Sequence, residues 1–156
     1  MSRESMMALM GDLSEALGIE GLALEEDHCR LQAQGEDLTL DLDYVEEGEL
    51  VVLSCPLGPV AAERREAVMA AFLSANCFWQ GTGGRTLSLD AVGEGLLQAQ
   101  VPLAGLDFPA FYKALEGFAA SGEQWVERLR DLNQGAAEPA KAAEAAPPPD
   151  AGMIRG

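Results

Sequence analysis

The chain has 156 residues, of which 26 are acidic and 10 basic, so its formal charge is −16. Hydrophobic residues make up 48% of it and the mean hydropathy is +0.02, which is enough apolar material for folding despite the charge. This composition excludes nucleic acid and anionic membrane surfaces as partners, because both are bound through clustered Lys and Arg, and only Arg64 and Arg65 are adjacent here. No apolar run approaches the ~20 residues of a membrane span, and the N-terminus lacks the pattern of a cleaved leader. We therefore expect a cytoplasmic, water-soluble protein.

The negative charge is concentrated in residues 1–50, which contain 14 acidic and two basic side chains. Such a segment favours a very soluble protein, or one that receives a basic or apolar partner. The three cysteines, Cys29, Cys55 and Cys77, form neither a paired framework nor a Cys-x-x-Cys motif. We expect them to be reduced and partly buried.

The first half of the sequence predicts a helix followed by three strands. Apolar residues recur at helical spacing over 2–17, and Gly18 stands where a helix usually ends. Alternating apolar and polar residues predict strands that begin at Cys29 and extend over 38–44, and residues 50–55 predict a strand that is covered on both faces. Three antiparallel strands are the simplest arrangement.

The second half predicts a helix, further strands and a last helix. Residues 61–76 carry an apolar stripe broad enough for a helix to contact two surfaces. Extended structure is predicted at 78–80, a reversing turn at 81–84, and strands at 86–89 and 96–103. Asp107 is a good N-cap for a final helix whose apolar seam continues to Leu132.

The predicted fold class is therefore α+β, with a helix, a three-stranded meander, a helix, two to three strands and a helix around one antiparallel sheet. Residues 1–133 form this domain. The composition changes to Ala, Pro and Glu over 134–156, which predicts a disordered tail.

No motif for catalysis or metal binding emerges. The one histidine, His28, neighbours Cys29, but adjacent strand residues point to opposite faces. The glycine-rich stretch 81–86 lacks the lysine and the following helix of a phosphate loop, so it is predicted to be a hairpin turn. Asp41 and Asp43 share one strand face without calcium-loop spacing, and we expect them to be solvated. We predict no catalytic residue, no metal and no cofactor.

The remaining sequence feature that indicates a function is an excess of apolar residues available for contacts with partners. The first helix offers Met6, Met7 and Met10, whose side chains adapt to varied apolar partners. The second helix and the segment at Phe78 and Trp79 carry more apolar area than a small monomer easily covers, which predicts a homodimer.

In order and spacing, six segments resemble the class I type III secretion chaperones, the Tir-chaperone (CesT-like) family. They are Leu13–Ile19 (LSEALGI), Leu38–Leu42 (LTLDL), Leu53–Gly58 (LSCPLG), Phe72–Asn76 (FLSAN), Leu87–Asp90 (LSLD) and Leu106–Phe111 (LDFPAF), the last leading to Trp125. Together they cover residues 6 to 132.

The resemblance implies a cytoplasmic homodimer that binds the N-terminal segment of one or more secreted effectors of bacterial virulence and keeps it soluble and secretion-competent. It also implies the secretion ATPase or export apparatus as a further partner. The positions matching the dimer interface of the family are Val68, Met69, Phe72, Leu73, Phe78 and Leu87. Those matching its effector-binding grooves are Met6, Met10, Leu13, Leu38, Leu40 and Leu42.

One alternative comes from another class of protein. An acidic adaptor or regulator would occupy a basic surface of a folded partner, through carboxylates such as Asp41, Asp43, Glu46 and Glu47. The two hypotheses differ in which substitutions abolish binding: charge reversals for the adaptor, and polar replacement of apolar side chains for the chaperone.

Overall fold

The computed structural model describes residues 3–32 and 38–135. Its elements are α1 (Arg3–Leu17), β1 (His28–Gln32), β2 (Thr39–Val45), β3 (Leu50–Gly58), α2 (Arg65–Asn76), β4 (Thr86–Leu89), β5 (Gly95–Pro102) and α3 (Phe108–Gln134), with 3-10 turns η1 (Ala62–Arg64) before α2 and η2 (Cys77–Trp79) after it. This order confirms the predicted α+β class.

The five strands form one antiparallel sheet in the order β1-β2-β3-β5-β4. The β1–β2–β3 meander is the predicted one, and β5 inserts between β3 and β4. As a result, β1 and β4 are the two edge strands, each with one margin that no described strand pairs with.

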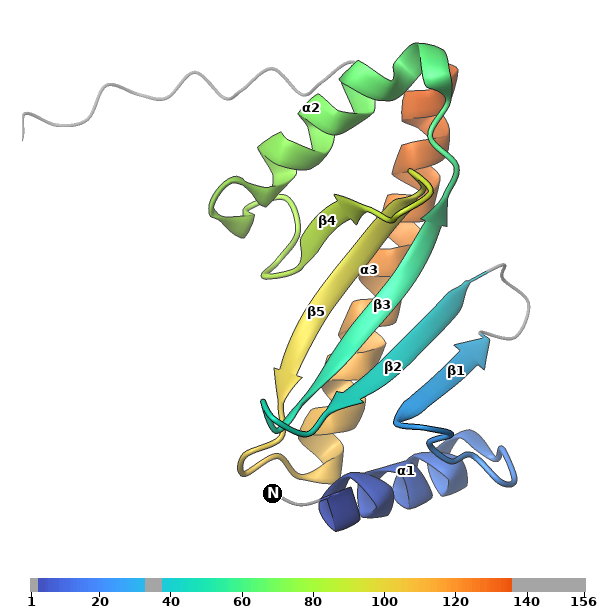
Figure 1. Ribbon diagram of the computed structural model, residues 1–156, viewed down its shortest axis with the longest axis vertical. Helices are drawn as coiled ribbons and strands as arrows, with labels where there is room; N and C mark the ends of the chain where they lie inside the picture. Colours follow the sequence, from blue (N-terminus) through green and yellow to red (C-terminus); the bar gives the residue numbers. More distant parts are fainter. Residues whose placement is uncertain (1–2, 33–37, 136–156) are drawn as a thin grey trace, which may run out of the picture.

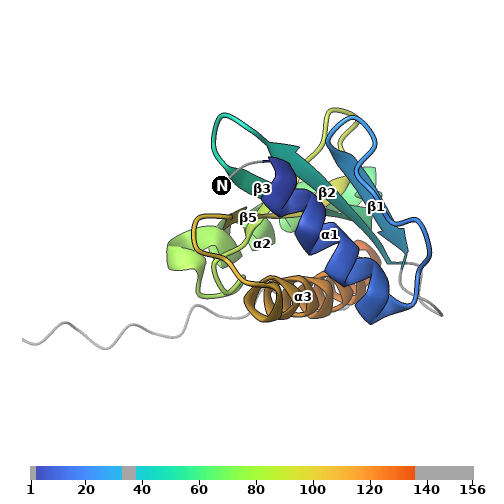
Figure 2. The ribbon, with the colours of Figure 1, turned by 90° about the horizontal axis from the view of Figure 1, so that it is seen from below.

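Helix α3 covers one face of the sheet, mainly over β3 and β5, while α1 lies across one end of this layer and α2 lies at the other (Figures 1 and 2). The seam predicted for α3 faces the sheet and is buried along its whole length: Phe111, Leu115, Phe118, Gly122, Trp125, Leu129 and Leu132. No helix among the described residues covers the opposite face of the sheet (Figure 1). A two-layer structure with one open sheet face results.

Both ends of α3 are capped. The carboxylate of Asp107 accepts a hydrogen bond from the N–H of Ala110 at 2.9 Å, as predicted for an N-cap. At the other end, Gly135 has φ 73°, and its N–H donates to carbonyls of the last turn. The predicted tail beyond this glycine lies outside the described residues.

The segment at 78–80 is not extended as predicted. Phe78 and Trp79 have φ values of 52° and 54° and form the turn η2. The expected strand would have lain beside β4, but the side chain of Asn76 already bonds both backbone groups of Leu87 there. The chain therefore turns away, and the following glycine-rich stretch connects η2 to β4 rather than two strands.

None of the helices in the described part of the chain is both long enough and apolar enough to cross a membrane.

Candidate protein-binding surfaces

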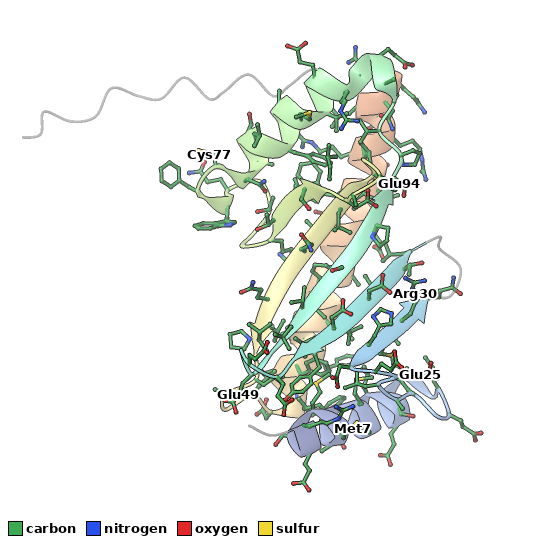
Figure 3. All side chains as sticks on the ribbon, viewed as in Figure 1. Met7, Glu25, Arg30, Glu49, Cys77 and Glu94 are labelled. Atoms are coloured by element: carbon green, nitrogen blue, oxygen red, sulfur yellow. The ribbon has the colours of Figure 1, made fainter. Side chains whose placement is uncertain are left out.

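Large apolar side chains are exposed at the C-terminal end of α2 and in η2. The exposed fractions are 42% for Met69, 68% for Leu73, 82% for Phe78 and 56% for Trp79. We call these four residues the α2 corner. Cys77 lies among them, at the end of α2 that projects from the body of the protein (Figure 3). Contiguous exposed apolar side chains of this size are typical of interaction sites in soluble proteins.

The opposite face of α2 fixes the α2 corner to the core. Phe72 packs edge-on against Trp125 of α3, with 5.8 Å between ring centroids. At the start of the helix, Asn133 of α3 accepts from the N–H of Ala61 at 2.9 Å, and Arg64 donates to the carbonyl of Leu132 at 3.1 Å. The orientation of α2 is thus set by α3, and the exposed residues stand on a rigid support.

The structure divides the six predicted dimer residues into two groups. Val68, Phe72 and Leu87 are buried within the protomer, whereas Met69, Leu73 and Phe78 are exposed. Trp79, which lies next to Phe78 but was not among the six, is also exposed. The sequence indicated Trp79 only as part of the apolar segment that it forms with Phe78.

A depression of about 450 Å³ lies beside Trp79 on the open face of the sheet. It is lined by Val52, Trp79, Gly84, Thr86, Gln98, Ala99 and Gln100. Beyond Trp79 this lining is mixed, with Thr86, Gln98 and Gln100 beside Val52 and Ala99, so the open sheet face next to the α2 corner is largely polar.

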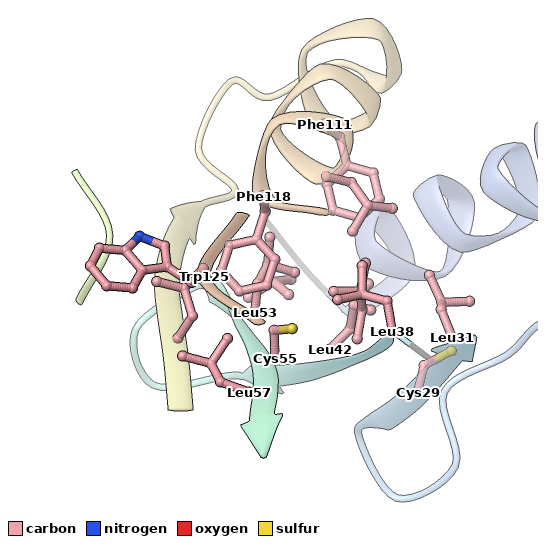
Figure 4. Packing of buried hydrophobic residues seen from close by; sticks show 14 of the residues in the cluster. Cys29, Leu31, Leu38, Leu42, Leu53, Cys55, Leu57, Phe111, Phe118 and Trp125 are labelled. Carbon is pink, nitrogen blue, oxygen red and sulfur yellow. The ribbon is translucent and has the colours of Figure 1, made fainter. Parts of the chain in front are cut away.

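The six residues predicted for effector binding all face the interior. Met6, Met10, Leu13, Leu38, Leu40 and Leu42 are buried. Figure 4 shows Leu38 and Leu42 within the cluster beneath α3, together with Phe111 and Phe118. They form the support of this region in the isolated protomer rather than its exposed surface.

Other apolar residues of the same region are accessible. Met7 is 43% exposed on α1, and Leu17 and Ile19 are 40% and 39% exposed at its end. We call these three residues the α1 surface. Acidic side chains surround it, including the exposed Glu4, Asp12, Glu15 and Glu20.

Edge strand β1 is attached to β2 by side-chain contacts with two aspartates on the open face. His28 Nδ1 lies 2.8 Å from Asp43 Oδ1, and Arg30 Nε donates to Asp41 Oδ1 at 2.6 Å. Asp41 is only 9% exposed, because Arg30 and His28 cover it. The expectation that Asp41 would be solvated is therefore wrong, since Arg30, which is in register with it, and the nearby ring of His28 exclude water.

Cys29 and Cys55 are buried and lack the environment of a nucleophile, whereas Cys77 is exposed and not partly buried as expected. Burial, with the charge of Asp41 as a smaller cause, raises the pKa of Cys55 to about 11 and raises that of Cys29 above its ordinary value. Thiols of this kind remain protonated and unreactive at neutral pH. His28 bonds to carboxylates on the open face, whereas Cys29 is buried on the other. Among the described residues, no group of His, Cys, Asp and Glu is arranged to hold a metal ion.

An open sheet face, a free edge strand and two exposed apolar surfaces define a protein that binds other polypeptides. The Tir chaperone protein (CesT) family model matches residues 8–126. The chain therefore belongs to this family, and it is a type III secretion effector chaperone. No curated protein matches the chain in sequence.

Solved structures share this fold. The ExsC–ExsE complex contains a chain with a TM-score of 0.71 and 21% identity, covering 81% of this chain and 94% of that one. In the HopA1–SchA chaperone–effector complex the TM-score is 0.63 and the identity 19%, with coverage of 81% and 98%. The Yersinia pestis type III secretion chaperone SycH, solved with a fragment of YscM2, gives 0.60 and 17%, with coverage of 76% and 98%.

Proposed function

We propose that this protein is a cytoplasmic homodimer that binds the N-terminal segment of a secreted effector and keeps it soluble and secretion-competent by binding alone. The match of the CesT family over residues 8–126 carries the proposal. The HopA1–SchA structure, which shares this fold, is a chaperone–effector complex, and this supports an effector as the partner. The export apparatus is the proposed recipient of the loaded complex.

The α2 corner is the proposed dimer contact. Met69, Leu73, Phe78 and Trp79 form an apolar surface on a rigid helix, and a two-fold contact would place this surface against its own copy. Val68, Phe72 and Leu87 support it from within the protomer. Burial of large aromatic side chains is a usual source of interface affinity.

The α1 surface and the free margin of β1 are the proposed effector site. An extended segment can add to an edge strand through main-chain hydrogen bonds, which tolerate many sequences, while apolar side chains contact Met7, Leu17 and Ile19. The six buried residues predicted from the sequence hold this region in shape. The surrounding carboxylates favour effector segments with basic residues beside apolar ones.

Co-expression with the protein encoded by a neighbouring gene tests this function. We expect the N-terminal segment of that protein to be soluble and to co-purify only when the chaperone is present. Met7→Glu should weaken this association, whereas Ala8→Glu, which adds the same charge at the adjacent exposed position, should leave it nearly unchanged. Loss of binding in Glu46→Lys/Glu47→Lys but not in Met7→Glu would favour the acidic adaptor instead.

A further inference from the structure

The two edge strands of the sheet differ in how the backbone groups on their outer margins are satisfied. In β4, Leu87 turns its N–H and C=O to the outer margin, and both groups bond to the side chain of Asn76, each at 2.9 Å. Because backbone groups alternate along an antiparallel strand, Leu89 is the other residue of β4 on this margin. A single residue is too short for a further strand to pair with.

Edge strand β1 is open over two residues. In the turn before it, His28 exchanges backbone hydrogen bonds of 2.8 and 2.9 Å with Glu25. The residues two and four positions further on, Arg30 and Gln32, face the same outer margin. Within residues 3–32 and 38–135, no backbone group bonds to them there. The margin of β1 therefore presents donors and acceptors to an added strand, whereas that of β4 is occupied.

The side-chain amide of Asn76 has the same donor and acceptor as a peptide group, so it satisfies Leu87 as a neighbouring strand would. A second copy could pair with this margin only after breaking these two hydrogen bonds, and it would form two of the same kind. The exchange gains nothing that offsets the translational and rotational freedom lost on association. The intramolecular amide is therefore the preferred partner of Leu87.

Asn76 is the last residue of α2, and its position is fixed from two sides. Earlier in the helix, Phe72 packs against Trp125 of α3. After the helix, the N–H of Gly81 donates to the carbonyl of Ala75 at 3.2 Å, and a Cβ at Gly81 would lie only 2.8 Å from the Cβ of Ala75. The chain that leads into β4 thus packs tightly against the end of α2, which holds the amide beside the edge.

The sequence of β4 lacks the features that usually protect an edge strand. Charged side chains and prolines are common protections, and Thr-Leu-Ser-Leu contains neither. The end of α2, with the exposed apolar side chains of the α2 corner, lies beside β4 (Figure 1). An antiparallel two-fold contact would pair the margin at Leu87 with the same margin of another copy. A second copy is therefore the partner that an uncovered β4 would bind.

We propose that the amide of Asn76 closes β4 to strand pairing with a second copy of this chain. Among the described strands, β1 is then the one edge that accepts another polypeptide. Without the amide, two sheets would join through β4, which is a different contact from that proposed between α2 corners. The inference concerns β4 alone, so it does not depend on the effector or on the dimer of the proposed function.

Light scattering over a dilution series tests the proposal with Asn76→Ala. At high concentration we expect this variant to reach twice the molar mass of the wild type, whether the wild type is a monomer or a dimer. Thr86→Lys in the Asn76→Ala background should restore the wild-type mass, because it adds a charge at an exposed position of the edge. In the dilute variant the Leu87 N–H should exchange with solvent about tenfold faster, and its protection should return as the mass rises.

Asn133→Ala is the matched control. The amide of Asn133 also bonds two backbone groups, those of Pro59 and Ala61 at 2.8 and 2.9 Å, but at the start of α2 rather than on β4. This variant should keep the wild-type mass. Asn76→Ser, whose side chain is too short to bond both groups of Leu87, is a second and milder variant at the same position.

The outcomes separate pairing through β4 from a general loss of stability. Wild-type mass in both Asn76 variants at every concentration would overturn the proposal. Equal association of Asn133→Ala would also overturn it, as would association that Thr86→Lys leaves unchanged. A mass increase confined to the Asn76 variants, with renewed protection of Leu87, supports an edge that the amide keeps closed.

Discussion

The side chain of Asn76 forms two hydrogen bonds with the backbone of Leu87: Nδ2 donates to the carbonyl and Oδ1 accepts from the N–H, each at 2.9 Å. The amide of a helix-end residue thereby takes the place of a neighbouring strand along part of β4. It joins the end of α2 to the sheet between Leu73 and Phe78 of the α2 corner.

Replacing Asn76 should separate these elements. We expect Asn76→Ala to lower the free energy of unfolding by about 2 kcal/mol, because two partly buried backbone groups lose their partner. Gln80→Ala, at an exposed position nearby, should change it by less than about 0.5 kcal/mol. Urea titrations of both variants measure the difference, and equal effects would contradict the structural role of the amide.

The proposed homodimer depends on the exposed face of α2. We expect Leu73→Glu or Phe78→Glu to raise the dimer dissociation constant by about 30-fold or more, as for central apolar residues of interfaces. Light scattering over a dilution series measures this.

Val92→Glu provides the control for this dimer prediction. Val92 is 81% exposed and precedes Gly93, which lies beside Arg65 at the opposite end of α2. The same charge there should leave the dimer unaffected. A wild-type chain that is monomeric at every concentration would rule the α2 contact out.

Two glycines lie in helices, and replacing each of them by alanine should change the stability of the fold in opposite directions. A Cβ at Gly122 would lie 2.9 Å from the Cys55 sulfur and 3.3 Å from Leu38, so Gly122→Ala should destabilise the fold by about 1–3 kcal/mol through overpacking. A Cβ at Gly11 meets nothing within 4 Å. Gly11→Ala should therefore stabilise the protein by about 0.5–1 kcal/mol through helix propensity. Thermal or urea unfolding distinguishes the two, and a smaller loss for Gly122→Ala in a Cys55→Ala background would identify the contact.

The buried thiol of Cys55 predicts a loss of stability at alkaline pH. Desolvation raises its pKa from 9.0 to about 11 in the folded protein. Between these values the unfolded thiol ionises while the folded one keeps its proton, so the free energy of unfolding falls as pH rises. Urea midpoints measured from pH 8 to 11 should decline less steeply for Cys55→Ala than for the wild type. Parallel declines would show that Cys55 does not contribute.

The sequence by itself determined the elements with strong periodicity and, through them, the family. The seven-residue seam of α3 is buried as predicted, and the alternation over β2 correctly places Leu40, Leu42 and Tyr44 inside. These patterns are readable because each repeats with the geometry of its own element. The order of the resembling segments predicts the CesT family, and the family match over residues 8–126 confirms it.

Only the tertiary structure decided which apolar residues are exposed. Met6 and Met7 are neighbours of the same type, yet Met6 is fully buried and Met7 is 43% exposed, because the sheet and α3 lie on one side of α1 only. The turn at Phe78 and the burial of Asp41 likewise depend on residues distant in sequence. The local sequence shows that a side chain is apolar. Whether that side chain is buried depends on which distant parts of the chain pack against it.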